Sequence, residues 1–224
     1  MKIFLDTADT KIIKEHYGTG LIDGVTTNPT LIRKSGRDPE EVYQELADYG
    51  VRDISMEVVG DEETMTSEGR RLHSKYAFQS KKLSINPVTI KVPLSPEGLR
   101  SCRSLALDGI KVNVTLVFSA AQAVLASKAG ATYVSPFVGR LDDQSVNGIA
   151  LINQIASIYR MHGSQTQVLS ASIRSVQHVT DSFLNGANIC TMPPSVFEKM
   201  YNHILTDKGL ELFDQDWKAT RERL

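Results

Sequence analysis

Residues 88–93 read Val-Thr-Ile-Lys-Val-Pro, and this run sets the pattern of the whole chain. Its β-branched residues are typical of a strand that is buried on both faces, as in a parallel sheet. A second run of this kind, Lys-Val-Asn-Val-Thr-Leu-Val, follows at residues 111–117. The segment between them, residues 96–107, has helical character. Strand, helix and strand in this order predict a βαβ unit with two parallel strands.

The same alternation continues in both directions along the chain. Strands are predicted at residues 2–6, 24–27, 53–59, 88–93, 111–117, 132–136, 167–171 and 188–192. Helices are predicted at residues 39–49, 62–79, 96–107, 119–128, 146–161, 175–184 and 195–204, with a further helix at 207–222 after the last strand. Eight such units in 224 residues favour a single α/β domain over residues 1–224, a closed (β/α)8 TIM barrel. The alternative is an open doubly wound sheet, but no G-x-G-x-x-G motif follows any predicted strand to support its nucleotide-binding form.

Composition restricts the classes of partner. The chain has 25 basic and 26 acidic residues and a net charge of −1, which argues against a nucleic-acid-binding surface as its main purpose. No stretch approaches the ~18 apolar residues of a membrane-spanning helix, and the amino-terminal segment does not resemble a signal peptide. Cys102 and Cys190 are far apart and sit in apolar patterns, so we expect buried free thiols and a reducing, cytoplasmic compartment.

In a barrel of this kind, side chains at the carboxyl ends of the strands line the active site. Candidate residues at or just beyond these ends are Asp6, Thr27, Asn28, Glu57, Lys91, Asn113, Thr115, Ser135, Phe137, Arg140, Ser172 and Arg174. Lys91 is the most informative, because a buried ammonium group is costly unless it is paired or neutral. One interpretation is a structural ion pair with Asp6 or Glu57. The other is a desolvated amine that acts as a Schiff-base nucleophile, with proton carriers around it.

Each remaining candidate also has a structural interpretation. Asp6 precedes a helical segment and could serve as an N-cap. Asn113 and Thr115 alternate with apolar residues and face the same side of their strand, where they could form an internal hydrogen-bond layer. Arg140 and Arg174 could be solvated, although each follows a late strand, where barrel enzymes often bind phosphate. Singly, none of these residues decides between a scaffold and a catalytic site.

Taken together, the local motifs resemble one family. The matching runs are Phe4-Leu5-Asp6-Thr7-Ala8, Gly24-Val25-Thr26-Thr27-Asn28-Pro29, Ile90-Lys91-Val92-Pro93, Gly98-Leu99, Asn113-Val114-Thr115-Leu116, Ala129-Gly130-Ala131, Ser135-Pro136-Phe137-Val138-Gly139-Arg140 and Ala171-Ser172-Ile173-Arg174. They occur in family order over almost the whole chain. The sequence resembles the small transaldolases and the closely similar fructose-6-phosphate aldolases.

The resemblance implies a class I aldolase mechanism, with no metal and no cofactor. Lys91 would form an imine with a ketose and hold a three-carbon dihydroxyacetone unit while an aldose leaves. Asp6 resembles the residue that handles the proton of the breaking carbon–carbon bond. Glu57 resembles the acid/base that acts through a water held with Thr115.

The binding residues carry over from the same resemblance. Asn28, Asn113 and Ser135 resemble hydrogen-bond partners of the three-carbon unit, next to Thr27 at the end of its strand. The expected phosphate ligands are Arg140, Ser172 and Arg174. Small-molecule sugar phosphates are therefore the expected substrates.

Two positions separate the subfamilies. Fructose-6-phosphate aldolases typically carry Gln at the position of Glu57 and Tyr at that of Phe137, so this chain is of the transaldolase type. A tyrosine hydroxyl could position the water that releases the enamine, whereas phenylalanine cannot. The first expectation is a transaldolase of the pentose phosphate pathway. A fructose-6-phosphate aldolase that releases dihydroxyacetone and a catalytically silent sugar-phosphate-binding barrel are the alternatives.

Small members of this family form ring-shaped oligomers, often pentamers paired into decamers, in which the carboxyl-terminal helix packs on a neighbour. The expected helix at 207–222, with Leu210, Leu212, Phe213 and Trp217, is compatible with such a homo-oligomer. The alternative is that these residues cover their own barrel.

Overall fold

The computed structural model describes residues 1–77 and 86–221, and within them eight parallel strands close into a barrel. The strands are β1 (Lys2–Asp6), β2 (Gly24–Thr26), β3 (Ile54–Glu57), β4 (Val88–Pro93), β5 (Lys111–Val117), β6 (Tyr133–Pro136), β7 (Gln167–Ser170) and β8 (Ile189–Met192). They follow chain order around the barrel, and β8 pairs with β1. The predicted TIM barrel is confirmed, and the open-sheet alternative is wrong.

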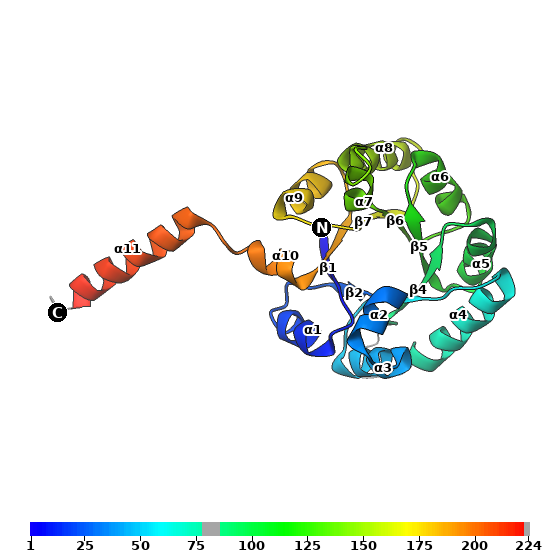
Figure 1. Cartoon of the computed structure of the whole chain (residues 1–224), viewed down its shortest axis with the longest axis horizontal. Helices are drawn as coiled ribbons and strands as arrows, with labels where there is room; N and C mark the ends of the chain where they lie inside the picture. The colour runs from blue at the N-terminus through cyan, green and yellow to red at the C-terminus, as the bar shows by residue number, and fades with distance from the viewer. Residues whose placement is uncertain (78–85, 222–224) are drawn as a thin grey trace.

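Helices surround the strands, except for the last one, which extends away from the barrel (Figure 1). They are α1 (Thr10–Tyr17), α2 (Pro29–Ser35), α3 (Pro39–Tyr49), α4 (Glu62–Tyr76), α5 (Pro96–Leu107), α6 (Ala120–Lys128), α7 (Val138–Asp142), α8 (Gly148–Met161), α9 (Val176–Leu184), α10 (Pro194–Lys199) and α11 (Ile204–Arg221). The ends of two predicted helices, at residues 78–79 and 222, lie outside the described part of the chain. No helix within that part is long and apolar enough to cross a membrane.

The observed helices differ from the predicted ones in two ways. The single helix predicted at 195–204 is wrong, because α10 ends at Lys199 and a separate helix, α11, begins at Ile204. The helical segment expected after Asp6 is α1, whereas two short helices, α2 and α7, were not predicted. Helix α2 has no fully buried residue and contacts the core through the half-buried Leu31 and Ile32. Asn28 caps its start, because the Asn28 side chain accepts a hydrogen bond from the Leu31 amide. Two adjacent apolar residues in so short a helix form no apolar periodicity to detect.

The core has two parts. The larger packs the outward faces of the strands against the helices and includes Leu46, Met56 and Ile155, all fully buried. Cys102 and Cys190 are buried free thiols, as predicted. A smaller cluster around Phe4 and Tyr133 lies inside the barrel, because side chains alternate between the two faces of a strand.

The amino-terminal end of the barrel is filled by a polar cluster centred on Asp53. Its carboxylate accepts hydrogen bonds from the hydroxyls of Thr89 and Tyr133, both at 2.8 Å, and from Lys111 Nζ at 3.0 Å. These residues come from four different strands or strand ends. Asp53 therefore ties the barrel together on the side opposite to the predicted active site.

Replacing Asp53 with alanine is expected to lower the free energy of unfolding by about 3 kcal/mol, because the Lys111 ammonium group and two buried hydroxyls lose their partner. Lys111 reaches solvent, which keeps the loss at the lower end of the range for buried ion pairs. Urea unfolding followed by circular dichroism measures the loss. Asp216→Ala, on the exposed helix α11, is the control and should leave the midpoint in place. Equal urea midpoints for Asp53→Ala and Asp216→Ala would contradict the stabilising role given to Asp53.

Candidate active site

Lys91 lies on β4 inside the barrel, with only 6% of its side chain exposed. Its Nζ atom donates a hydrogen bond to the Thr27 carbonyl oxygen at 2.9 Å and lies 3.1 Å from Glu57 Oε2. The strand register explains this pairing, because Glu57 and Lys91 are direct neighbours across β3 and β4. The ion pair that the sequence left open therefore exists, and its partner is Glu57. An amine held against a buried carboxylate is also an amine with a proton acceptor at contact distance.

A cavity of about 110 Å³ opens above Lys91. It collects eight of the predicted residues, Asp6, Asn28, Lys91, Thr115, Ser135, Phe137, Arg140 and Ser172, together with Thr26, Ala171 and Thr191. The other four predicted residues, Thr27, Glu57, Asn113 and Arg174, do not line it. The carboxyl ends of the strands thus form one polar cavity with a single buried amine at its floor.

Asp6 faces this cavity and does not cap a helix. Helix α1 is capped by Asp9, whose side chain accepts hydrogen bonds from the amides of Lys11 and Ile12. Asp6 Oδ1 instead accepts a hydrogen bond from Thr26 Oγ1 at 2.7 Å. Burial raises the pKa of the Asp6 carboxyl, and the charge of Lys91 and the Thr26 hydrogen bond oppose the rise. A carboxyl group with a raised pKa can take and return a proton at neutral pH more readily than an ordinary aspartate.

Thr115 carries a buried hydroxyl that forms no hydrogen bond with any described residue. An unpartnered buried hydroxyl is costly, so such groups usually bind water or a ligand. Thr115 lines the same cavity as Lys91. The site therefore has a free hydroxyl group where the resemblance places a water.

Asn113, Ser135 and Thr27 belong to a hydrogen-bond layer inside the barrel. Ser135 Oγ donates to Asn113 Oδ1 at 2.7 Å, and Asn113 Nδ2 donates to Ser55 Oγ at 3.3 Å. The Thr27 hydroxyl donates to the Ser55 carbonyl at 2.9 Å. Ser135 alone of the three reaches the cavity, so the layer fixes its hydroxyl for a bound molecule.

The three expected phosphate ligands are divided. Arg140 and Ser172 line the cavity, and the Arg140 guanidinium carbon lies 4.9 Å from the centre of the Phe137 ring. Ser172 has φ of +58°, an uncommon left-handed conformation for a residue with a side chain. Arg174 lies outside the cavity and forms a bidentate ion pair with Asp143. The structure thus brings Arg140 and Ser172 together in the cavity, whereas Arg174 is paired with Asp143 outside it.

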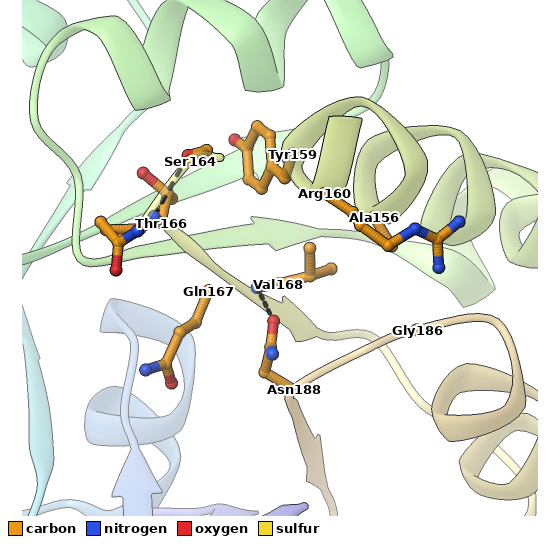
Figure 2. A pocket seen from close by; sticks show the side chains of 10 residues that line it. Ala156, Tyr159, Arg160, Ser164, Thr166, Gln167, Val168, Gly186 and Asn188 are labelled. Atoms are coloured by element: carbon orange, nitrogen blue, oxygen red, sulfur yellow. Dashed lines mark hydrogen bonds between the residues drawn. The ribbon is translucent and has the colours of Figure 1, made fainter. Parts of the chain in front are cut away.

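A larger cavity of about 410 Å³ lies at the opposite end of the barrel, near the start of β7 (Figure 2). Its polar lining includes Ser164, Gln167 and Asn188, and Asn188 Oδ1 accepts a hydrogen bond from the Val168 amide at 2.8 Å. It contains no lysine and no carboxylate. Within residues 1–77 and 86–221, no group of three His, Cys, Asp or Glu side chains is placed to hold a metal ion. The cavity above Lys91, in contrast, contains a buried amine that could form a covalent bond with a ligand.

Comparison with known proteins identifies the family of the chain. The family model described as Transaldolase/Fructose-6-phosphate aldolase matches residues 3–224. The chain belongs to this family. The resemblance drawn from the sequence motifs is confirmed.

Several relatives of this transaldolase/fructose-6-phosphate aldolase chain bear the name "Probable transaldolase". One from Paracoccus denitrificans is 52% identical over 225 residues, covering all of both chains. One from Caulobacter sp. strain K31 is 49% identical over 226 residues, again covering all of both chains. One from Ruegeria sp. strain TM1040 is 51% identical over 221 residues, covering 98% of this chain and 97% of the relative. These names indicate an enzyme of the transaldolase type.

Sequence reasoning gave no role to two residues of this family member's cavity, Thr26 and Thr191. Their hydroxyl oxygens lie 2.7 Å apart, and Thr26 also donates to Asp6. Because a hydroxyl has one proton, Thr191 must donate to Thr26 while Asp6 is ionised. The sequence does place one threonine near the carboxyl end of β2 and another near the carboxyl end of β8, where side chains can enter the cavity. Only the barrel shows that these strands both adjoin β1.

Proposed function

We propose that this enzyme is a transaldolase, which transfers a dihydroxyacetone unit from a ketose phosphate to an aldose phosphate through a Schiff base on Lys91. The single observation that carries the proposal is the contact between Lys91 Nζ and Glu57 at 3.1 Å, beneath a cavity lined by Asp6 and Thr115. A protein that only binds sugar phosphates does not need a buried amine with two carboxyl groups, Glu57 and Asp6, near it. The names of the relatives support transfer as the reaction.

Imine formation uses the ion pair directly. Lys91 passes a proton to Glu57, and the neutral amine attacks the C2 carbonyl carbon of the ketose to give a carbinolamine. The carbinolamine then loses its hydroxyl as water, with a proton returned from Glu57. Thr115 supplies a free hydroxyl that can hold the water for this exchange. The resulting iminium carbon is the acceptor for the electrons of the next step.

Cleavage uses Asp6 on the other side of the cavity. The Asp6 carboxylate takes the proton of the C4 hydroxyl, the C3–C4 bond breaks, and its electron pair moves toward the iminium to form an enamine. An aldose phosphate leaves. The enamine then attacks the carbonyl of an incoming aldose phosphate, Asp6 returns its proton to the new hydroxyl, and water releases the ketose product from Lys91. Asn28 and Ser135 hold the three-carbon unit, and Arg140, Ser172 and Arg174 bind the phosphate.

Transfer is favoured over release because Phe137 lines the cavity without a hydroxyl. The enamine then has no group that helps water to protonate it, so it waits for an acceptor aldehyde. In the pentose phosphate pathway the substrates are sedoheptulose 7-phosphate with glyceraldehyde 3-phosphate, and the products are erythrose 4-phosphate with fructose 6-phosphate.

The test is the dependence of turnover on the acceptor. With fructose 6-phosphate alone, we expect release of about one equivalent of glyceraldehyde 3-phosphate per active site, followed by a stop. Erythrose 4-phosphate should restore continuous turnover, and borohydride should trap a three-carbon adduct on Lys91. Steady release of free dihydroxyacetone without acceptor would instead support the aldolase. Saturable binding of fructose 6-phosphate with no adduct would support a silent barrel.

Replacing Phe137 with tyrosine is expected to raise turnover without acceptor about tenfold or more, because the new hydroxyl can position a water for enamine protonation. The measurement is formation of free dihydroxyacetone from fructose 6-phosphate. Phe118→Tyr is a matched control, since its ring packs on Phe137 with centroids 5.7 Å apart but does not line the cavity. Similar rates for both variants would contradict the role given to Phe137.

We also propose that α11 packs on a neighbouring copy of the chain. None of its residues is buried, and Phe213 and Trp217 are 73% and 60% exposed. Figure 1 shows the helix extending away from its own barrel. Large apolar side chains in such a position favour a homo-oligomer, such as a pentamer or decamer.

Light scattering should report a mass several times that of one chain, and the double substitution Phe213→Glu with Trp217→Glu should reduce this mass. A monomeric wild-type protein would contradict the proposal.

A further inference from the structure

Arg174, an expected phosphate ligand, is not free in the structure. Its Nη2 atom lies 2.5 Å from Asp143 Oδ2, and its Nη1 atom pairs with Asp143 Oδ1. The end of the guanidinium group, which offers two parallel N–H donors, is therefore fully used by one carboxylate. A phosphate binds arginine through the same paired donors. Asp143 and a phosphate thus compete for the same face of Arg174.

The surrounding charges reinforce this competition. Hydrogen bonds from Arg174 hold the pKa of Asp143 below its usual range, and the positive charge of Arg140 acts in the same direction. Asp143 therefore stays ionised at neutral pH and lies in the field of both arginines. Asp143 thus places a negative charge that both arginines attract, as they would attract a phosphate. Asp143 therefore remains a competing anion at neutral pH.

The stem of Arg174 is close to the cavity even though its tip is not. A Cβ atom added to Gly139 would lie 2.7 Å from Arg174 Nε, so the side chain runs directly over the backbone at the start of α7. The Gly139 amide also donates to the Ser172 carbonyl at 3.0 Å, which joins this backbone to a residue of the cavity. Half of the Arg174 side chain is exposed. Its outer bonds are therefore free to rotate, and such a rotation is the movement that phosphate binding would require.

We propose that Asp143 occupies Arg174 in the empty site and competes with the substrate phosphate for it, which lowers the affinity of the site for phosphorylated substrates. This inference rests on the proposed function, in which Arg174 binds the substrate phosphate. A sugar phosphate replaces the carboxylate and gains Arg174 as a ligand beside Arg140. An unphosphorylated sugar has no charge with which to replace it. The ion pair thus weakens phosphate binding moderately and keeps the guanidinium from binding other groups.

The test compares Asp143→Asn with Asp142→Asn. The second variant removes one negative charge from the neighbouring position, where Asp142 contacts His178 and the Gly148 amide but not Arg174. For Asp143→Asn we expect the KM for fructose 6-phosphate and the inhibition constant of inorganic phosphate each to fall about threefold, the value of an exposed ion pair. For Asp142→Asn, whose charge acts on Arg174 only through space, both constants should change by much less.

A second measurement separates this proposal from the proposed function. Dihydroxyacetone carries no phosphate, so the concentration that half-saturates its borohydride trapping on Lys91 should be the same in all three proteins. Unchanged or weaker phosphate binding in Asp143→Asn overturns the proposal, and so does an equal effect in Asp142→Asn. Failure of the proposed function is distinct, because wild-type protein would then give no adduct on Lys91.

Discussion

Substitution of Lys91 by arginine is expected to lower transaldolase turnover by at least about 10³-fold, because the imine can no longer form. Arginine keeps the positive charge and the donors that contact Glu57 and the Thr27 carbonyl. Its guanidinium group is always protonated, so it cannot attack a carbonyl. The variant thus removes the nucleophile and retains the ion pair. A purely structural role for Lys91 predicts near-normal activity instead.

The measurements are coupled turnover of fructose 6-phosphate with erythrose 4-phosphate and the mass of the borohydride-trapped protein. Lys91→Met should be equally inactive but less stable by about 3 kcal/mol, since it leaves Glu57 buried without a partner. Lys128→Met, on the outer helix α6, is the control and should keep full turnover. An active Lys91→Arg protein, or an adduct on another lysine, would contradict the assignment.

The barrel could be predicted from the sequence because its strands are buried on both faces. Residues 88–92 are all buried, with only Thr89 and Lys91 polar among them, and the helix that follows shows one apolar stripe. Short helices escape such reasoning. Helix α7 has five residues, and Phe137 at its N-cap position provides no side-chain hydrogen bond, so neither periodicity nor capping chemistry marks it. The break between α10 and α11 is similarly invisible, because apolar residues continue on both sides of it.

The sequence predicted which residues form the candidate site, but it did not predict which of these residues contact one another. Polar residues at strand ends had to meet once the strands were parallel and closed. The sequence left Asp6 and Glu57 equally available to Lys91, because both lie at strand ends. The register of β3 and β4 makes Glu57 the direct neighbour. Register is a property of the closed sheet, and no local pattern encodes it.

Arg174 shows the same limit for a side chain on a loop. Its place after β7 predicted a phosphate ligand, but the bidentate pair with Asp143 depends on the turn that α7 makes beside it. Long flexible side chains choose among several partners, and the choice follows from the tertiary arrangement of charges. The same reasoning explains Thr191, whose neighbour Thr26 is remote in sequence and adjacent only in the barrel.

Replacing Asp6 with asparagine is expected to lower turnover about 10²- to 10⁴-fold, the usual contribution of a positioned acid/base. Asparagine keeps the shape and can still accept the Thr26 hydrogen bond, but it cannot take the proton of the cleaved bond. Trapping of dihydroxyacetone on Lys91 should persist, because imine formation uses Glu57. Burial raises the pKa of Asp6, so ionisation of this carboxyl disfavours folding at neutral pH. Asp6→Asn should therefore unfold no more easily than wild type.

The pH dependence gives the sharpest test of Asp6. Cleavage needs the carboxylate, so the rate should fall with decreasing pH through an apparent pKa above the ordinary value of about 4. Thr26→Val removes a hydrogen bond that holds this pKa down, so the acidic limb should move to higher pH. Asp9→Asn is the control, since its side chain caps α1 outside the cavity and asparagine caps equally well. An unmoved limb in Thr26→Val, or near-normal turnover in Asp6→Asn, would assign the proton transfer to another group.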